Sequence, residues 1–384
     1  MKRPVQWSLW IIPLVLSACG LIMISSLSLR NSIAIGSPYG PPFKQLQFLI
    51  VGLICAFCCA ITPPEFFRKR GGIFWCISLI LVTLAAVPGI GIKVGGARRW
   101  LVFAGLRFQP LELLLISVPL VMANRLIKSQ RQGFGIFANP TLFVMICSVV
   151  PLMAQPNFGG SILVIAICLF MHTEAKGWRW PLIGGAILVM LGILAILVTP
   201  YRMKRFLAFR DPWEDAQGKG YQIIQGLVAF SNGGVTGVGI GKGLQKDNIM
   251  PEADTDYIFP AIGEEFGLIG TMTLILLYAL WTRRVYILYK RLKLLNYNYL
   301  ALLSLGLAAS VVFPMFVNVA GVTKLMPLSG IPMPFISAGG SSMLCMWLKI
   351  GMLMGINTIA FSEDNEDEPE QANIKNKILN KNAE

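Results

Sequence analysis

Three carboxylates stand together immediately before the longest apolar segment of the chain: Glu252, Asp254 and Asp256. Acids are expensive at the start of a membrane helix, so they are either functional or held in water. A carboxylate within hydrogen-bonding reach of a hydroxyl group acts as a general base. Asp256 lies at the junction with the apolar segment and is the strongest candidate for this role. The alternative is a helix N-cap, a position that aspartate also favours.

Basic residues form two clusters, one in a short loop and one at the start of a long polar loop. Arginine binds phosphate oxygens through two parallel hydrogen bonds, so these clusters favour a site for an anionic ligand. The alternative is anchoring to lipid headgroups, which long basic side chains reach from the membrane edge. The clusters consist of Lys93, Arg98, Arg99 and Arg107, and of Arg202, Lys204, Arg205 and Arg210.

A further acid, Glu112, follows Gln109 and Pro110 at the start of an apolar segment. Proline suits the first turn of a helix, which places Glu112 at most one turn into the membrane. A carboxylate there pairs with a cation or faces a wet cavity. Pairing with an arginine of the first basic cluster and contact with a substrate both remain open. Glu264 and Glu265, about two turns into the longest segment, are likewise expected to pair or to line a cavity.

Two runs of glycine and proline accompany the acids. Residues 233–243 contain a Gly-x-Gly-x-Gly core, but no strand precedes it, which excludes a dinucleotide-binding or P-loop motif. These glycines serve either tight folding or close approach to a ligand. Residues 327–342 contain three prolines in eight residues and cannot form a regular helix. Because non-helical backbone at membrane depth lines protein or a wet cavity, the second run predicts a cavity wall.

The composition predicts an all-α, polytopic membrane protein. The chain is 55% hydrophobic and 14% charged, against about 25% charged in soluble domains. A large outer loop, residues 199–255, separates the seventh and eighth helices. The fifth and sixth segments are either two spans or one re-entrant pair. Ten apolar segments are expected to form helices, at 7–27, 46–61, 73–87, 110–123, 141–154, 159–171, 181–198, 257–281, 299–322 and 341–361.

The distribution of Lys and Arg predicts the orientation. With the N-terminus inside, the inner loops hold 15 of these residues and the outer loops 14, but seven of the 14 lie in the long loop, where they count little. Both termini are therefore expected in the cytoplasm. Residues 1–361 form the membrane domain. Residues 362–384 carry seven acids and three lysines without an apolar period, which predicts a disordered cytoplasmic tail.

Taken in order, the motifs resemble those of the SEDS family (shape, elongation, division and sporulation) of membrane glycosyltransferases. They cover nearly the whole membrane portion, and two of them are more similar to the division branch or its sporulation relative than to the elongation branch. These two are Gln245-Lys246 and Ile262-Gly263-Glu264-Glu265. The others include Gly96-Ala97-Arg98-Arg99-Trp100, Gln109-Pro110-x-Glu112, Gln155-Pro156-Asn157-Phe158-Gly159, Tyr201-Arg202-Met203-x-Arg205, Asp211-Pro212-Trp213, Pro251-Glu252-Ala253-x-Thr255-Asp256-Tyr257 and Pro332-x-Pro334-Phe335-Ile336-Ser337-x-Gly339-Gly340-Ser341-Ser342.

The resemblance implies a polymerase of lipid II, a disaccharide-pentapeptide on undecaprenyl pyrophosphate, at the outer face of the cytoplasmic membrane during cell division. Asp256 takes the catalytic position. The reaction joins C1 of a donor muramyl sugar to the 4-hydroxyl of an acceptor glucosamine, and pyrophosphate is the leaving group. The substrate-binding residues are then expected to be Arg98, Arg99, Gln109, Glu112, Arg202, Arg205, Gln245, Lys246, Glu252, Thr255, Pro334, Ser337 and Ser341.

The resemblance also implies partners: a class B penicillin-binding transpeptidase, other division proteins and membrane lipids, but no nucleic acid. No cofactor is certain, although a divalent cation, Mg²⁺ or Mn²⁺, held near Asp256 would share the work of the arginines. The alternatives are a flippase or transporter of lipid II and a scaffold for the transpeptidase. Three positions depart from the family pattern: Asp254 replaces a histidine, Leu115 a lysine and Ala338 a tyrosine.

Overall fold

The computed structural model of the chain describes residues 7–34, 40–94, 97–103, 105–132, 139–179, 181–186, 203, 209–218, 220–244 and 252–362. Nearly all regular structure in these ranges is helical, which confirms the predicted class. The helices are α1 (Ser8–Ala34), α2 (Gly40–Ile61), α3 (Pro64–Ala86), α4 (Pro110–Gln132), α5 (Pro140–Ala154), α6 (Phe158–Lys176), α9 (Tyr221–Gly233), α10 (Ile258–Leu294), α11 (Asn298–Val322) and α12 (Gly340–Ser362), with a 3₁₀ turn, η2, at Pro212–Asp215.

Within the described residues, eight helices are long and apolar enough to cross a membrane: α1, α2, α3, α4, α6, α10, α11 and α12. The apolar helix α5 is shorter. These nine correspond to nine of the ten expected segments. Most of the seventh, 181–198, lies outside the described residues. These nine helices were each predicted from hydropathy alone, and they support the prediction of a multi-pass protein.

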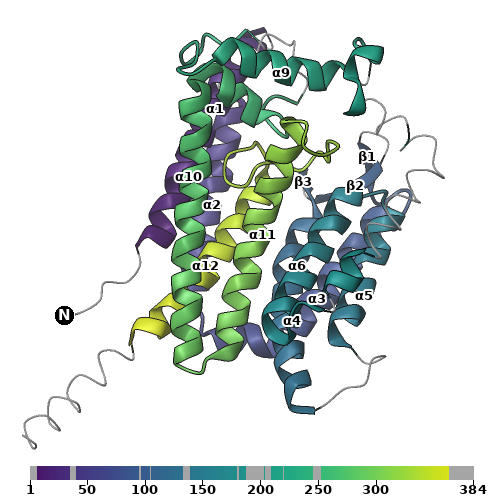
Figure 1. The fold of residues 1–384 in the computed structure, drawn as a ribbon, viewed down its shortest axis with the longest axis vertical. Coiled ribbons are helices and arrows are strands. Elements are labelled where there is room, and N and C mark those ends of the chain that lie inside the picture. Colours follow the sequence, from purple (N-terminus) through teal and green to yellow (C-terminus); the bar gives the residue numbers. More distant parts are fainter. Residues whose placement is uncertain are drawn as a thin grey trace, which may run out of the picture.

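The helices form one bundle with a distinct interior (Figure 1). In α4 and α11, 78% of the membrane-length window is buried, and in α12 72%, whereas in α2 and α3 only 28% is buried. The central helices α4, α11 and α12 are therefore surrounded by protein, while α2 and α3 turn most of their apolar side chains outward. One close contact joins α2 to α12, where a Cβ added at Gly351 would lie 2.2 Å from the Ala56 carbonyl oxygen. Such small residues let membrane helices approach closely.

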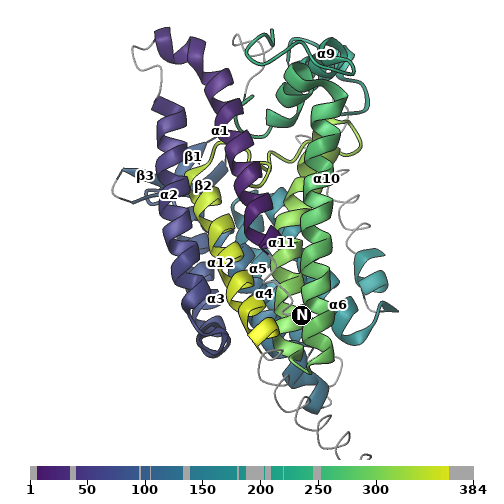
Figure 2. The same ribbon diagram turned by 90° about the vertical axis from the view of Figure 1, so that its left-hand side faces the viewer.

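One end of the bundle carries α9 and a small sheet, and α1 begins and α12 ends at the opposite end (Figures 1 and 2). The sheet comprises β1 (Ile92–Val94), β2 (Ala97–Phe103) and β3 (Leu106–Phe108), paired antiparallel in the order β1-β2-β3. The sequence predicts only a short loop here. Strands of three to seven residues between two long helices give too weak a periodic signal to be recognised.

Helix α10 is longer than the apolar segment that predicted it and is interrupted at Gly267, which has φ 67° and ψ −164°. The glycine-rich run packs against this interruption. Val238 and Gly239 donate to the carbonyls of Glu264 and Glu265, and Leu268 donates back to Gly234. The run thus replaces helical hydrogen bonds that are lost at the interruption. Tight folding therefore explains why these residues are glycines.

Candidate functional site

Asp256 lies in a turn, residues 252–257, that is tied to the proline-rich segment, residues 327–339, by three side-chain and backbone contacts. Asn318 on α11 donates to the Asp256 carbonyl at 2.7 Å and to the Ile331 carbonyl at 2.8 Å. Ser337 Oγ donates to the Thr255 carbonyl at 2.5 Å. Ala338 N donates to the Asp254 carbonyl at 2.8 Å. The acidic turn and the proline-rich segment are therefore held as one unit, as expected for a cavity wall.

The carboxyl group of Asp256 is in an environment that suits a base. Burial raises the pKa of Asp256 to about 6, backbone hydrogen bonding opposes the shift, and the neighbouring charges of Glu252 and Asp254 add to it. Thr255 Oγ1 lies 3.3 Å from Asp256 Oδ1. A base with a pKa near the working pH is effective, because it is ionised and still binds a proton. The N-cap alternative is wrong, since Tyr257 occupies the N-cap of α10 and no side chain caps it.

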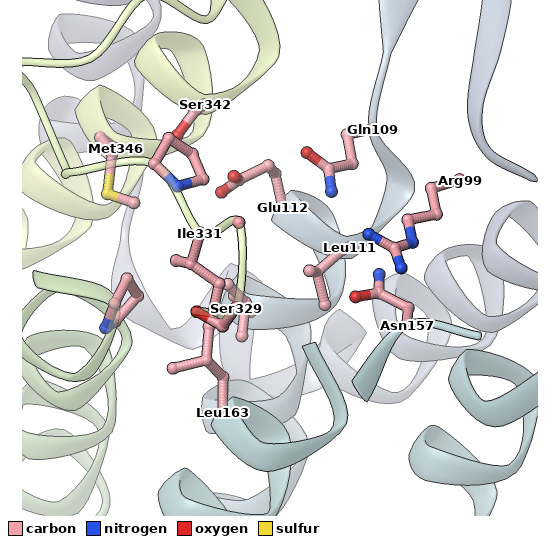
Figure 3. Close-up of a pocket in the computed structure, with 14 residues that line it drawn as sticks. Arg99, Gln109, Leu111, Glu112, Asn157, Leu163, Ser329, Ile331, Ser342 and Met346 are labelled. Atoms are coloured by element: carbon pink, nitrogen blue, oxygen red, sulfur yellow. The ribbon is translucent and has the colours of Figure 1, made fainter. Parts of the chain in front are cut away.

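A small pocket opens beside this turn, with an internal volume of about 30 Å³, and is partly open to solvent. Its walls come from β2, the start of α4, the start of α6, α11, α12 and the proline-rich segment. Figure 3 shows the polar side chains gathered around it. Three of the predicted binding residues line it: Arg99, Gln109 and Glu112. The polar lining is completed by Asn157, Ser329 and Ser342, none of which the sequence analysis selected.

Gly330 connects the pocket to Asp256. It lines the pocket, and a Cβ added to it would lie 3.6 Å from Asp256 Oδ2. Its φ of 66° is in the left-handed region that favours glycine. A residue with a side chain at this position would be strained and would stand between the carboxylate and the pocket. The absence of a side chain at Gly330 therefore leaves the carboxylate adjacent to the pocket.

Arg99 and Asn157 lie on the same side of the pocket (Figure 3). Arg99 Nη2 donates to the Pro156 carbonyl at 2.6 Å, which positions the guanidinium. Asn157 caps α6 by accepting from Gly160 N at 3.1 Å through Oδ1. Its Nδ2 is buried and has no hydrogen-bond partner among the described residues. This side of the pocket thus presents an oriented cation beside an N–H donor, a combination that suits phosphate or carbonyl oxygens.

Glu112 lies deeper in the same pocket and is 4% exposed. Ser342 on α12 lines the pocket with it, and the cation that interacts with it electrostatically is Lys349. The sequence analysis proposed arginines of the short loop as partners and overlooked Lys349. The signal was available, because Lys349 is an ionisable residue inside the last apolar segment, and such residues are functional candidates by default.

The remaining predicted binding residues fall into four groups. Glu252 and Thr255 adjoin Asp256, and Thr255 Oγ1 donates to Glu252 Oε2 at 2.8 Å. Arg98 is on β2, beside the pocket-lining Arg99. Within the wall itself, Ser341 Oγ accepts from Gln109 N at 3.4 Å, the Pro334 carbonyl accepts from Tyr278, and Ser337 makes the contact to Thr255 described above. Four lie outside the described residues: Arg202, Arg205, Gln245 and Lys246.

Glu264 and Glu265 are both 2% exposed and bind protein groups. Glu264 Oε1 accepts from Asn232 Nδ2 at 3.1 Å and from Leu244 N at 3.2 Å. Glu265 Oε1 accepts from Ser26 Oγ at 2.7 Å. These hydrogen bonds join α10 to α9 and α1. Within the described ranges, no group of three or more His, Cys, Asp or Glu residues is arranged to hold a metal ion.

The family model described as "Cell cycle protein", which covers FtsW, RodA and SpoVE, matches residues 6–360. The chain belongs to this family. Among individual relatives, it is 35% identical to the probable peptidoglycan glycosyltransferase FtsW of Francisella salina, over 93% of this chain and 90% of the relative. It is 34% identical to the protein of the same name from Coxiella burnetii, over 92% of this chain and 98% of the relative.

Solved structures of this family have the same fold. One, reported under "Structural coordination of polymerization and crosslinking by a peptidoglycan synthase complex", matches with a TM-score of 0.75 and 25% identity, covering 93% of this chain and 98% of that chain. The rod shape determining protein RodA of Thermus thermophilus matches with a TM-score of 0.68 and 24% identity, covering 92% of this chain and 96% of its own. The membrane architecture inferred from hydropathy is therefore that of the FtsW/RodA/SpoVE family.

Proposed function

We propose that this protein is a peptidoglycan glycosyltransferase that polymerises lipid II during cell division, with Asp256 as its general base. The observation that carries the proposal is the position of Asp256 in a chain of this family. Its carboxylate is adjacent, across Gly330, to a pocket lined by Arg99, Glu112 and Asn157. The FtsW relatives are named peptidoglycan glycosyltransferases, which supports the same activity here.

The reaction needs one proton to be removed and one charge to be stabilised. Asp256 accepts the proton of the 4-hydroxyl of the acceptor glucosamine as its oxygen forms a bond to C1 of the donor muramyl sugar. The bond from C1 to the diphosphate oxygen breaks, and its electron pair leaves with undecaprenyl diphosphate. With a pKa of about 6, Asp256 is mainly ionised at neutral pH and able to take this proton.

The charge that develops on the diphosphate is met by the basic residues. Arg99 is the first candidate, because its guanidinium is already oriented in the pocket by Pro156. A preorganised cation stabilises a leaving group more than a mobile one, since no reorganisation accompanies the reaction. Asn157 Nδ2 adds a donor beside it, and Glu112 accepts hydrogen bonds from substrate hydroxyl or amide groups.

The site faces outward in this proposal, and both termini are cytoplasmic. The supporting observations are the bias of Lys and Arg toward the inner loops and the position of the acidic turn at the end of the bundle opposite the end of α12 (Figure 1). In a cysteine-free background, Glu214→Cys should react with an impermeant thiol reagent added outside. Lys290→Cys should react only after permeabilisation. The reverse pattern would place the pocket in the cytoplasm.

A class B penicillin-binding transpeptidase is the proposed partner, and other division proteins are expected with it. The similar fold of a protein from a peptidoglycan synthase complex supports this pairing. A transpeptidase would cross-link the glycan as it leaves the pocket. Copurification of the two proteins from membranes, and its loss on deletion of the transpeptidase membrane helix, would test the assembly.

A divalent cation is proposed to act only together with the diphosphate. Mg²⁺ retains several waters and is commonly held by one or two carboxylates plus substrate phosphates, and Glu252, beside the base, fits such a role. The cation would then neutralise phosphate charge. Chelation should lower glycan synthesis but leave the melting temperature of the substrate-free protein unchanged. A lower melting temperature after chelation would instead indicate a resident metal.

The decisive experiment supplies lipid II to the purified protein and its transpeptidase and measures glycan length. Long glycan should form, and Asp256→Asn should lower its synthesis by about 100-fold or more, because asparagine cannot accept the proton. A transporter would move lipid II across vesicles without making glycan, and a scaffold would do neither. Glycan synthesis by a well-expressed Asp256→Asn protein at the normal rate would refute the assignment of the base.

A further inference from the structure

Lys349 is a fully enclosed charged residue on α12, one turn beyond the pocket-lining Met346. It is 0% exposed, inside a helix whose membrane-length window is 72% buried. Its ammonium donates to the Ser310 carbonyl on α11 at 3.0 Å and to Met346 Sδ at 3.6 Å. An ammonium group carries three N–H donors, and these two acceptors leave the third available. A buried charge of this kind is retained only when other groups compensate it.

The face of α12 that carries Lys349 is turned toward Glu112. Met346 and Ser342, one and two turns before Lys349 on the same face, both line the pocket with Glu112. The ammonium of Lys349 interacts electrostatically with the Glu112 carboxylate. Glu112 Oε2 is buried and accepts no hydrogen bond within the described residues. An acid on α4 and a base on α12 thus face one another inside the bundle.

We propose that Lys349 is the counter-charge of Glu112, and that this pair, formed across α4 and α12, positions the Glu112 carboxylate at the wall of the pocket. The positioning role rests on the proposed function, in which Glu112 contacts the substrate. The pairing itself rests only on the burial and placement of the two charges. Either residue alone would leave an uncompensated ion in a water-poor interior, which is more unfavourable than removing both.

Leu115 provides a way to move the charge. It lies three residues after Glu112 on α4, is 2% exposed and lines the same pocket. Side chains three residues apart on a helix are neighbours, so a lysine at 115 would reach Glu112 from its own helix. Leu115 is also the position where a lysine is expected from the family pattern. In this chain the positive charge that the family pattern places at position 115 on α4 is therefore supplied by Lys349 on α12.

The first test measures thermal stability in detergent. Lys349→Met should lower the melting temperature by about 5 °C or more, because it leaves Glu112 buried without its counter-charge. Adding Glu112→Gln to Lys349→Met should recover most of this loss, although it is a second substitution. Lys44→Met, at an exposed lysine, is the control and should not change the melting temperature. The pairing would be overturned if the melting temperature of the double variant fell as far as that of Lys349→Met, or by the sum of the losses of the two single variants.

The second test measures glycan synthesis from lipid II. Lys349→Met should lower the rate by about 10-fold or more, and Leu115→Lys combined with Lys349→Met should restore most of it, because the counter-charge returns from α4. Leu115→Lys alone should lower the rate, since two cations then share one carboxylate. A Lys349→Met protein of normal activity, or a double variant no better than Lys349→Met, would refute the positioning role.

The two tests also separate this proposal from the proposed function. If Glu112→Gln keeps normal activity while the melting temperatures show the expected coupling, the pair exists but Glu112 does not serve the substrate, and the positioning role fails. If neither the wild-type protein nor any variant makes glycan, the proposed function fails. The melting temperatures then still decide whether Glu112 and Lys349 are paired. If Lys349→Met does not fold but Lys349→Met with Glu112→Gln does, the pairing is supported.

Discussion

The amide nitrogen of Asn318 joins the two halves of the site: the same Nδ2 group donates to the carbonyl of Asp256 at 2.7 Å and to that of Ile331 at 2.8 Å. One residue therefore fixes both the turn that carries the acid and the segment that lines the pocket. Asn318 is 2% exposed and comes from α11, one of the most enclosed helices. The distance between Asp256 and the pocket wall thus depends on a residue that lies outside the family motifs used to recognise the site.

Asn318→Leu should lower glycan synthesis by about 10-fold or more and destabilise the protein by about 1–3 kcal/mol, because two buried carbonyl groups lose their donor. Activity and melting temperature are measured on the same preparation. Asn357→Leu is the matched control, since Asn357 is a fully buried asparagine on α12 whose side chain has no hydrogen-bond partner among the described residues. It should keep its activity and its stability. Similar losses in both variants would argue against a specific role of Asn318.

Gly330→Ala should strongly reduce activity, because the new methyl group would lie between Asp256 and the pocket as well as strain a backbone with φ of 66°. Strain of this kind costs about 1–3 kcal/mol. Gly89→Ala separates the two effects: Gly89 has φ of 88°, and a Cβ there would meet nothing within 4 Å. Both variants should lose stability, but only Gly330→Ala should lose most of its glycan synthesis. Equal activity of the two variants would contradict the role of Gly330.

The sequence was sufficient to locate the membrane helices, because an apolar run of span length is a strong local signal. It also identified the proline-rich segment as non-helical and Asp256 as the acid at the junction. What it missed depends on tertiary contacts. Helix α10 continues to Leu294, well past the end of the apolar run at 281, because its charged last turns extend beyond the hydropathy signal.

The partner of Glu112 was missed for the same reason. Arginines near in sequence were considered, whereas Lys349 is brought to Glu112 only by the packing of α12 against α4. Asn157 and Gly330 were also missed, since a helix cap and a glycine give no local sign that they border a pocket. The small sheet escaped notice because its strands are too short to show a period of two.

Arg99→Lys should lower glycan synthesis by about 10-fold or more although it keeps the positive charge. Lysine has a single ammonium and cannot form the paired hydrogen bonds that a guanidinium makes to a diphosphate. It would also lose the geometry of the contact to Pro156. Arg107→Lys, at an exposed residue of β3, is the control and should remain active. A fully active Arg99→Lys protein would reduce Arg99 to an anchor for lipid headgroups.

The rate of glycan synthesis should fall below about pH 6, by about tenfold for each further pH unit, because only ionised Asp256 acts as a base. The charges of Glu252 and Asp254 both raise the pKa of Asp256, and so does its burial. Removing one like charge favours the ionised form, so Asp254→Asn should move the acid limb of the pH–rate profile to lower pH. The profile is measured with lipid II at constant ionic strength. A shift to higher pH, or none, would contradict Asp256 as the titrating group.

The same raised pKa predicts the pH dependence of stability. Because the pKa of Asp256 is higher in the folded protein than its ordinary value of 3.8, protonation favours the folded state. The stability that this group contributes is fully present below pH 3.8 and is lost as the pH rises through about 6. Asp256→Asn removes that loss, so its melting temperature relative to the unmodified protein should rise between about pH 4 and pH 6 and level off above pH 6. If the difference in melting temperature is constant over this range, the carboxyl group is not destabilised by its site, and the acid limb must belong to another residue.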